Sequence, residues 1–261
     1  MKGRTEMTTS DAMPNLTADQ LADLHTLLEG AKTVELKVTV ADRNQRSAVQ
    51  ALEMDPLDAE IRQVTYFDTP DLELNRRGLI VRARRTPVRD DTVIKLRPVV
   101  PQDLPADLRR RKGLGIEVDA MPGAFVCSAS LPERKKRGKV KEVLAGERAI
   151  RSLFTKDQKA FFEEYAPDGL DLDDLAMLGP ITTLKLKFTP RDYPGRLVAE
   201  LWMYPDGSRI LELSTKCAPA DAFEEAARTR AYLRERGIDL TGEQQAKTRT
   251  ALDFFSRELL A

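Results

Sequence analysis

Charged side chains recur at alternate positions along several short segments of this sequence. The cationic pairs are Arg82 with Arg84, Lys95 with Arg97, and Lys185 with Lys187. Because successive side chains of a β-strand point to opposite faces, each pair would project from one face of its strand. Lys and Arg grouped in this way can bind the oxygens of a polyanion such as a chain of phosphates.

Carboxylates occupy the same kind of position on other segments. They are Glu117 with Asp119 and, singly, Glu35, Glu200 and Glu212. Carboxylate oxygens are ligands that Mg²⁺ and Mn²⁺ prefer. Cations on some strands and carboxylates on others therefore suit a polyanion that is bound together with a divalent metal.

Period-two alternation predicts eight strands to carry these residues. They span 34–40, 61–67, 79–85, 92–99, 115–120, 181–189, 197–203 and 210–216. On most of them the face opposite the charges is apolar, as Leu36 and Val38 show for the first. An open antiparallel sheet would pack that apolar face on helices and leave the charged face in water. Alternatively, the sheet closes into a barrel whose lumen is the charged face.

Helices are expected over much of the remaining sequence. Apolar spacing and capping residues predict them at 17–30, 47–53, 143–154, 157–165, 220–236 and 242–260. Residues 132–141 have the composition of a basic, turn-rich segment, and 205–207 that of a hairpin turn. We expect residues 1–30 to form an N-terminal extension with one helix, and 31–261 to form one domain.

Composition argues against several functional classes. The chain carries 42 Lys and Arg against 42 Asp and Glu, so it lacks the basic excess of non-specific nucleic-acid binders. Its only cysteines, Cys127 and Cys217, cannot build a disulfide framework or a structural zinc site. A single histidine, His25, argues against Ser-His-Asp hydrolysis. With so few cysteines, we expect the reducing cytoplasm as its location. No apolar run approaches the roughly 18 residues of a membrane span, so we expect no membrane contacts.

Several segments resemble, in order, the motifs of the CYTH domain, or triphosphate tunnel metalloenzyme, superfamily. TVELK at 33–37 is similar to its ExExK signature. YFDTPDL at 66–72, with GLIVRAR at 78–84, is similar to its YFDT-P-L and G-x-x-L-R-x-R segment. IKLR at 94–97, IEVD at 116–119 and ILELS at 210–214 follow at corresponding places, and the resemblance covers about residues 31–261.

The resemblance implies an α+β fold: a closed eight-stranded antiparallel β-barrel that forms a tunnel, with a charged lumen and helices packed outside. It implies action on a triphosphate-containing small molecule with Mg²⁺ or Mn²⁺ as cofactor. The phosphate-binding residues would be Lys37, Arg82, Arg84, Lys95, Arg97, Lys185, Lys187 and Arg191. The metal ligands would be Glu35, Glu200 and Glu212, and the catalytic residues Glu35, Lys37 and Glu117, with Asp119 as a helper.

Two positions depart from the motifs of that superfamily. Thr33 stands where ExExK has its first glutamate, and Ser214 where the I-E-x-E strand has its second acid. Neutral oxygens hold a divalent cation more weakly than carboxylates do. Three functions therefore stay open: hydrolysis of inorganic or small organic triphosphate, a class IV type of adenylyl cyclase, and non-catalytic binding of polyphosphate or nucleotide.

Other polar features have a simpler interpretation. Asp68 is expected to hold the Thr-Pro bend that follows it rather than to catalyse. The basic runs at 109–112 and 133–141 lie in expected loops, and no aromatic residues interleave them for base stacking. We therefore expect solvated loops there and no nucleic-acid partner.

Overall fold

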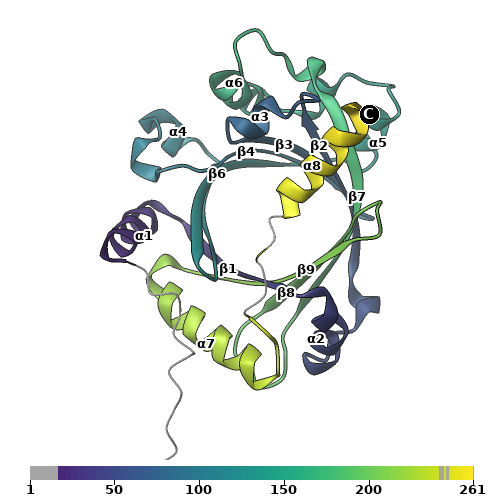
Figure 1. Ribbon diagram of the computed structural model, residues 1–261. Coiled ribbons are helices and arrows are strands. Elements are labelled where there is room, and N and C mark those ends of the chain that lie inside the picture. The colour runs from purple at the N-terminus through teal and green to yellow at the C-terminus, as the bar shows by residue number, and fades with distance from the viewer. Residues whose placement is uncertain (1–16, 241–243, 245–246, 261) are drawn as a thin grey trace, which may run out of the picture.

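A closed β-barrel forms the centre of the structure, a computed structural model that describes residues 17–240, 244 and 247–260 (Figure 1). Its strands are β1 (Thr33–Val40), β2 (Glu60–Asp68), β3 (Leu79–Arg85), β4 (Asp90–Leu96), β5 (Gly115–Met121), β6 (Ala124–Lys135), β7 (Ala176–Phe188), β8 (Leu197–Met203) and β9 (Arg209–Cys217). Around the barrel they follow the order β1-β5-β6-β4-β3-β2-β7-β8-β9, and β9 pairs with β1 to close it. The closed arrangement is therefore the one that this chain adopts.

The prediction of eight antiparallel strands is wrong in two respects. The barrel has nine strands, because residues 124–135 form β6, part of which was assigned to a turn-rich segment. Small residues and Pro132 weaken the apolar alternation of β6, although Cys127 and Leu131 are buried. In addition, β1 and β5 pair in parallel, whereas every other pair is antiparallel. The alternation within a strand does not specify the direction of its neighbour.

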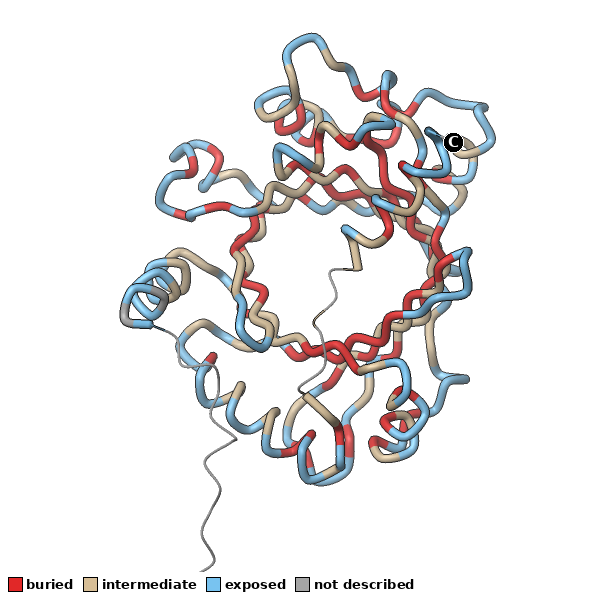
Figure 2. Tube along the Cα trace, viewed as in Figure 1, coloured by how far each residue is buried: buried red, intermediate tan, exposed pale blue. Residues whose placement is uncertain are grey.

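Over most of the barrel, alternation along the strands separates an apolar outer face from a polar inner face. Val34, Val81, Ile94 and Val118 are almost completely buried and belong to one hydrophobic cluster on the outside of the barrel. Figure 2 shows buried residues following the strands around the ring. Because side chains of a strand alternate, the charged residues between these apolar positions face the lumen.

Helices cover the outside of the barrel. They are α1 (Ala18–Gly30), α2 (Gln45–Ala51), α3 (Glu73–Arg76), α4 (Ala106–Arg110), α5 (Lys139–Leu144), α6 (Lys156–Tyr165) and α7 (Ala222–Glu235). α1, α2, α6 and α7 lie near their predicted ranges, whereas the short helices α3 and α4 were not predicted. The predicted helix at 143–154 is interrupted at Gly146, whose φ is +73°. A left-handed glycine of this kind commonly ends a helix. None of the helices within the described ranges is long and apolar enough to span a membrane.

The last helix, α8 (Lys247–Leu260), packs against lumen-facing residues at one end of the barrel, and its first turn lies over the barrel opening in the view of Figure 1. Its Ala251 and Leu252 are buried in a cluster with Tyr66, Trp202 and Ile210 from three strands. This apolar cluster closes the end of the barrel where β2 and β8 finish. Residues 241–243, where the start of this helix was predicted, lie outside the described residues.

Asp68 has the structural role expected of it. Its buried carboxylate accepts backbone N–H bonds from Thr69 at 2.8 Å, Leu74 at 2.9 Å and Asn75 at 3.0 Å. These bonds satisfy N–H groups at the start of α3, which would otherwise lack partners. Asp68 therefore stabilises the turn between β2 and α3.

Candidate active site

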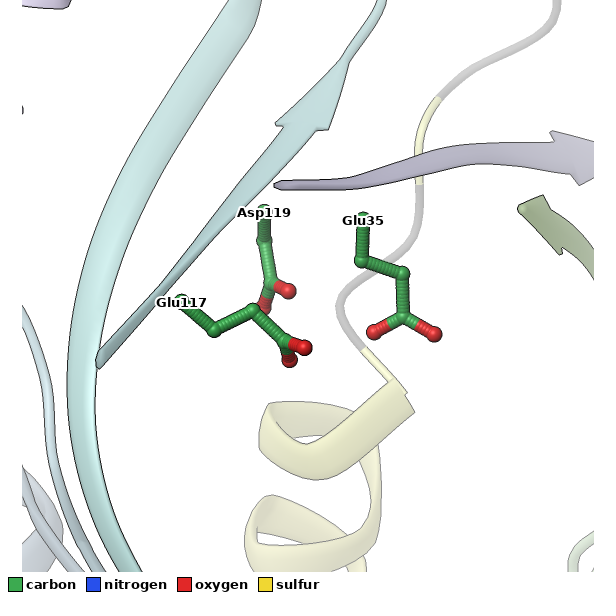
Figure 3. A group of neighbouring side chains, drawn as sticks. All are labelled: Glu35, Glu117 and Asp119. Carbon is green, nitrogen blue, oxygen red and sulfur yellow. The ribbon is translucent and has the colours of Figure 1, made fainter. Parts of the chain in front are cut away.

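Three carboxylates from neighbouring strands converge inside the barrel. Glu35 lies on β1, and Glu117 and Asp119 lie on β5, which runs parallel beside it. Each offers an oxygen that lies within 4.8 Å of the other two, and Figure 3 shows the three side chains meeting. We call Glu35, Glu117 and Asp119 the carboxylate trio. It is the one group of this kind among the residues that the structure describes.

Cations from two sides surround the innermost member of the trio. The Nζ of Lys37 lies 2.9 Å from Asp119 and 3.0 Å from Glu35. Lys95 and Arg97 approach Asp119 at 3.8 and 3.4 Å from β4 and its C-terminal end. Burial alone would raise the pKa of Asp119, but the charges of Lys37 and Lys95 outweigh it and lower that pKa. Asp119 is therefore an ionised carboxylate with only 1% of its side chain exposed.

Lys95 responds to burial in the opposite way. Desolvation, together with the charges of Lys37 and Arg97, lowers its pKa to about 8 against the attraction of Asp119. A lysine with this pKa changes its charge close to neutral pH, unlike an ordinary exposed lysine. The positive charge of this part of the lumen consequently depends on pH.

Thr33 and Ser214, which replace the two expected acids, both contact the trio. The Thr33 hydroxyl donates to Glu117 at 3.2 Å, and the Ser214 hydroxyl donates to Glu35 at 3.3 Å. Lys216 on β9 also forms ion pairs with Glu117 and, at 3.9 Å, with Glu35. Two hydroxyl groups and an ammonium group thus contact Glu35 and Glu117.

A second pair of carboxylates lies deeper, next to α8. Glu200 on β8 and Glu212 on β9 lie opposite each other in register. Both form ion pairs with Lys247 at the start of α8, and the Nζ of Lys247 lies 2.7 Å from Oε1 of Glu212. Lys185 also pairs with Glu200 at 2.7 Å. Burial would raise the pKa of Glu200, but Lys247 and Lys185 hold it well below its usual value.

The expected metal ligands are consequently found in two different places. Glu35 lies in the carboxylate trio, whereas Glu200 and Glu212 share Lys247. The trio instead unites Glu35 with two residues that the sequence marks for catalysis and assistance, Glu117 and Asp119. Spacing along a strand predicts which side chains share a face, but it does not predict which strands are neighbours.

Arg82 and Arg84 on β3 both face the lumen, but they differ in their hydrogen bonds. The Nε of Arg84 donates to Asp91 at 2.9 Å. The Nε of Arg82 is buried and has no hydrogen-bond partner among the described residues. A buried donor without a partner is costly, so Arg82 is suited to an anion that enters the lumen.

Lys187 and Arg191 lie farther out than the other predicted phosphate-binding residues. Lys187 is exposed at the end of β7 and lines a cavity of about 970 Å³ together with Glu35, Lys185 and Lys216. Arg191 lies on the loop after β7, where 76% of its side chain is exposed and Glu53 is its partner at 3.6 Å. Lys187 therefore lies at the mouth of the barrel, whereas Arg191 lies apart from the other predicted phosphate-binding residues.

Lys216, Arg62 and Asp91 are among the lumen residues that were missed as site candidates, and each continues an alternation. Lys216 follows Glu212 and Ser214 at the same spacing on β9. Arg62 lies on β2, where it pairs with Glu60, and Asp91 lies on β4 opposite Arg84. Lys216 and Arg62 lie within predicted strands, so their spacing could have identified them, and extending the strand predicted at 92–99 by one residue would have added Asp91.

The carboxylate trio has the donor chemistry that a divalent cation requires. Mg²⁺ and Mn²⁺ favour hard oxygen ligands, and three carboxylates supply them here. The buried carboxylate of Asp119 is ionised, and Lys37 at 2.9 Å holds it beside Glu35 and Glu117. The residues present therefore fit such an ion.

Comparison with known proteins identifies the fold through structures alone. No family model matches the chain, and no curated protein matches it. A provisionally assigned adenylate cyclase from Bacillus halodurans matches 84% of this chain and 97% of its own, with a TM-score of 0.58 and 14% identity. A provisionally assigned adenylyl cyclase from Hippeastrum, in which triphosphatase activity is dominant, matches 82% of this chain and 92% of its own, with a TM-score of 0.58 and 15% identity. The chain therefore has the barrel fold that these two proteins share.

Proposed function

We propose that the protein belongs to the CYTH, or triphosphate tunnel metalloenzyme, superfamily and hydrolyses a triphosphate with Mg²⁺ or Mn²⁺ in the barrel lumen. The observation that carries this proposal is the meeting of the carboxylate trio with the cations Lys37, Lys95 and Arg97 inside a closed barrel. The substrate would be inorganic triphosphate or a small organic triphosphate.

The cations of the lumen would bind the triphosphate chain. Lys37, Arg82, Arg84, Lys95, Arg97 and Lys185 line its walls, and Lys187 stands at its mouth. Ion pairs with protein carboxylates hold most of these groups in place. The Nε–H of Arg82 has no hydrogen-bond partner among the described residues and could donate to a phosphate oxygen. Charge-assisted hydrogen bonds of this kind are the strong ones in phosphate recognition.

The trio would hold the metal, and Glu200 and Glu212 would hold Lys247. A divalent cation, when bound, would neutralise phosphate oxygens as charge develops on them. Phosphoryl transfer needs little covalent chemistry, so positioning and charge stabilisation account for most of the catalysis. Within this chain, Lys37 would fix Glu35 and Asp119, while Glu35 and Glu117 would orient the attacking water.

Adenylyl cyclase activity is the second candidate, because both structural neighbours carry that provisional assignment. A cyclase acting on ATP would release pyrophosphate and cyclic AMP, whereas a hydrolase would release orthophosphate. Non-catalytic binding is the third candidate, because Thr33 and Ser214 replace acids beside the trio.

Product analysis separates these candidates. The protein is incubated with tripolyphosphate or ATP and Mn²⁺, and orthophosphate, pyrophosphate and cyclic AMP are quantified. We expect orthophosphate from tripolyphosphate, a loss of at least a hundredfold in Glu35→Gln, and no change in Glu163→Gln, which alters an exposed residue of α6. Cyclic AMP with pyrophosphate would favour the cyclase, and tight binding without any product would favour the binding protein.

A further inference from the structure

Lys216 is the charged residue at the outer side of the carboxylate trio, and it reaches the trio from a neighbouring strand. On β9 it lies in register with Glu35 of β1, and its side chain extends past β1 to Glu117 on β5. Its Nζ is 3.9 Å from Glu35 and closer still to Glu117. One ammonium group thus bridges two of the three carboxylates that could hold a metal.

The hydroxyl groups of Thr33 and Ser214 contact the same two carboxylates. Oε2 of Glu117 accepts from Thr33 and from Lys216, and Oε1 of Glu35 accepts from Ser214. Oε2 of Glu35 lies 3.0 Å from Lys37. Both oxygens of Glu35 and one of Glu117 are therefore engaged by donors of this chain, and a metal ion must displace or share them.

Lys216 differs from the other cations of the trio in its exposure. More than half of its side chain, 54%, is exposed, against 13% for Lys37 and 22% for Lys95. It also lines the cavity at the open end of the barrel, through which a ligand would reach the trio. An exposed lysine at this place can turn from the carboxylates to an entering anion without disturbing packed neighbours.

We propose that Lys216 is a specificity-determining residue that keeps free divalent cations off the carboxylate trio until a triphosphate draws its ammonium away. An ammonium group that contacts Glu35 and Glu117 opposes the binding of a doubly charged ion to the same carboxylates. A polyanion reverses this effect, because its oxygens offer the ammonium another partner. Metal and triphosphate then bind cooperatively, and each strengthens the binding of the other by the same factor. This inference rests on the proposed function, because it assigns the partner of Lys216 to the proposed substrate.

Titration of Mn²⁺ without any phosphate tests the exclusion directly. Free Mn²⁺ is measured by electron paramagnetic resonance with the parent protein, Lys216→Gln, Lys216→Arg and Lys156→Gln. Lys156 is an exposed residue of α6, so its variant removes the same charge from the outside of the barrel. We expect Lys216→Gln to bind Mn²⁺ at least tenfold more tightly than the parent, and the other two variants to bind it as the parent does. Adding Glu117→Gln to Lys216→Gln should abolish the gain.

A second titration follows the other partner of Lys216. Calorimetry with tripolyphosphate in the presence of EDTA should show an affinity at least tenfold lower for Lys216→Gln than for the parent. Mn²⁺ binding to Lys216→Gln that equals or falls below that of the parent would overturn the exclusion, provided that circular dichroism shows a folded variant. If the variant does not fold, the test uses the parent protein alone. The proposal requires tripolyphosphate to increase the affinity of the parent for Mn²⁺, and an unchanged affinity would contradict it. The Mn²⁺ titration contains no substrate, so a failure of hydrolysis would leave its result interpretable.

Discussion

Arg82 is the residue of the lumen whose role can be separated most cleanly from folding. Its buried Nε has no hydrogen-bond partner among the described residues, so truncating the side chain breaks no hydrogen bond of that atom. Arg84, its neighbour on the same face, is tied to Asp91 at 2.9 Å. The two arginines therefore provide a matched pair of variants.

We predict that Arg82→Met weakens tripolyphosphate binding without lowering stability. The loss of a charge-assisted contact should cost about 2 kcal/mol, which is roughly thirtyfold in affinity. Arg84→Met should weaken binding as well, and it should also lower the free energy of unfolding because Asp91 loses its partner. Calorimetry and urea unfolding measure the two effects, and unchanged affinity in Arg82→Met would remove Arg82 from the site.

Lys95 should make triphosphate binding depend on pH. Its pKa is lowered to about 8, so its ammonium is present at pH 7 and is lost as the pH rises through that value. Affinity for a polyanion should therefore fall between pH 7 and 9, by up to about tenfold per unit at the alkaline end. Lys95→Met should bind more weakly at pH 7 and follow a flatter profile.

Calorimetry without metal at several pH values tests this dependence. Tripolyphosphate itself changes protonation over this pH range, and this affects the parent and the variant equally. The difference between the two profiles therefore reports Lys95 alone. Parallel profiles across this range would show that Lys95 does not contact the ligand as a cation.

At the scale of elements, α8 contributes both apolar packing and a buried charge at the closed end of the barrel. Ala251 and Leu252 supply apolar contacts with Tyr66 and Trp202. Lys247 supplies the charge that Glu200 and Glu212 require in a buried place. The helix thereby determines how deep the lumen can be.

We predict that Lys247→Met destabilises the fold by about 3 kcal/mol, because it leaves two buried carboxylates without their shared cation. Arg249→Met on the same helix is the control, since 78% of the Arg249 side chain is exposed, and it should change stability by less than about 0.5 kcal/mol. Urea unfolding at pH 7 measures both.

The sign of the pH dependence gives a further check on this ion pair. The pKa of Glu200 is held well below 4.5, so the pair stabilises the folded state above about pH 4.5 and this contribution is lost as the pH falls further. The difference in stability between the parent and Lys247→Met should therefore narrow in acid. A constant difference down to pH 3 would mean that packing of Lys247, and not its charge, stabilises the end of the barrel.

The elements also show what the sequence could predict. Alternation correctly placed β1, β3 and β8, and with them the charged face, because the face of a strand depends only on local spacing. It could not reveal that β1 and β5 pair in parallel, since register and direction arise from contacts distant in the chain. For the same reason it could not group Glu35 with Glu117 and Asp119, or assign Lys247 to Glu200 and Glu212.

At the scale of the whole molecule, the barrel has two different ends. α8 closes the end where β2 and β8 finish, and a cavity opens at the end where β1 begins and β9 finishes. The carboxylate trio and Lys216 lie toward that open end, and Lys247 lies toward the closed one. A triphosphate would therefore enter from one side, and any organic group that it carries would remain at the mouth.

The most direct measurement of the central claim is the rate of orthophosphate release from tripolyphosphate as Mn²⁺ is titrated. It compares the parent with Glu117→Gln, Glu212→Gln and the exposed-site control Glu163→Gln. The proposed mechanism predicts release that requires the metal, a metal midpoint at least tenfold higher in Glu117→Gln, and no change in Glu163→Gln. A shift in Glu212→Gln alone would place the metal beside Lys247. Release that needs no metal, or that Glu117→Gln leaves unchanged, would contradict catalysis at the carboxylate trio.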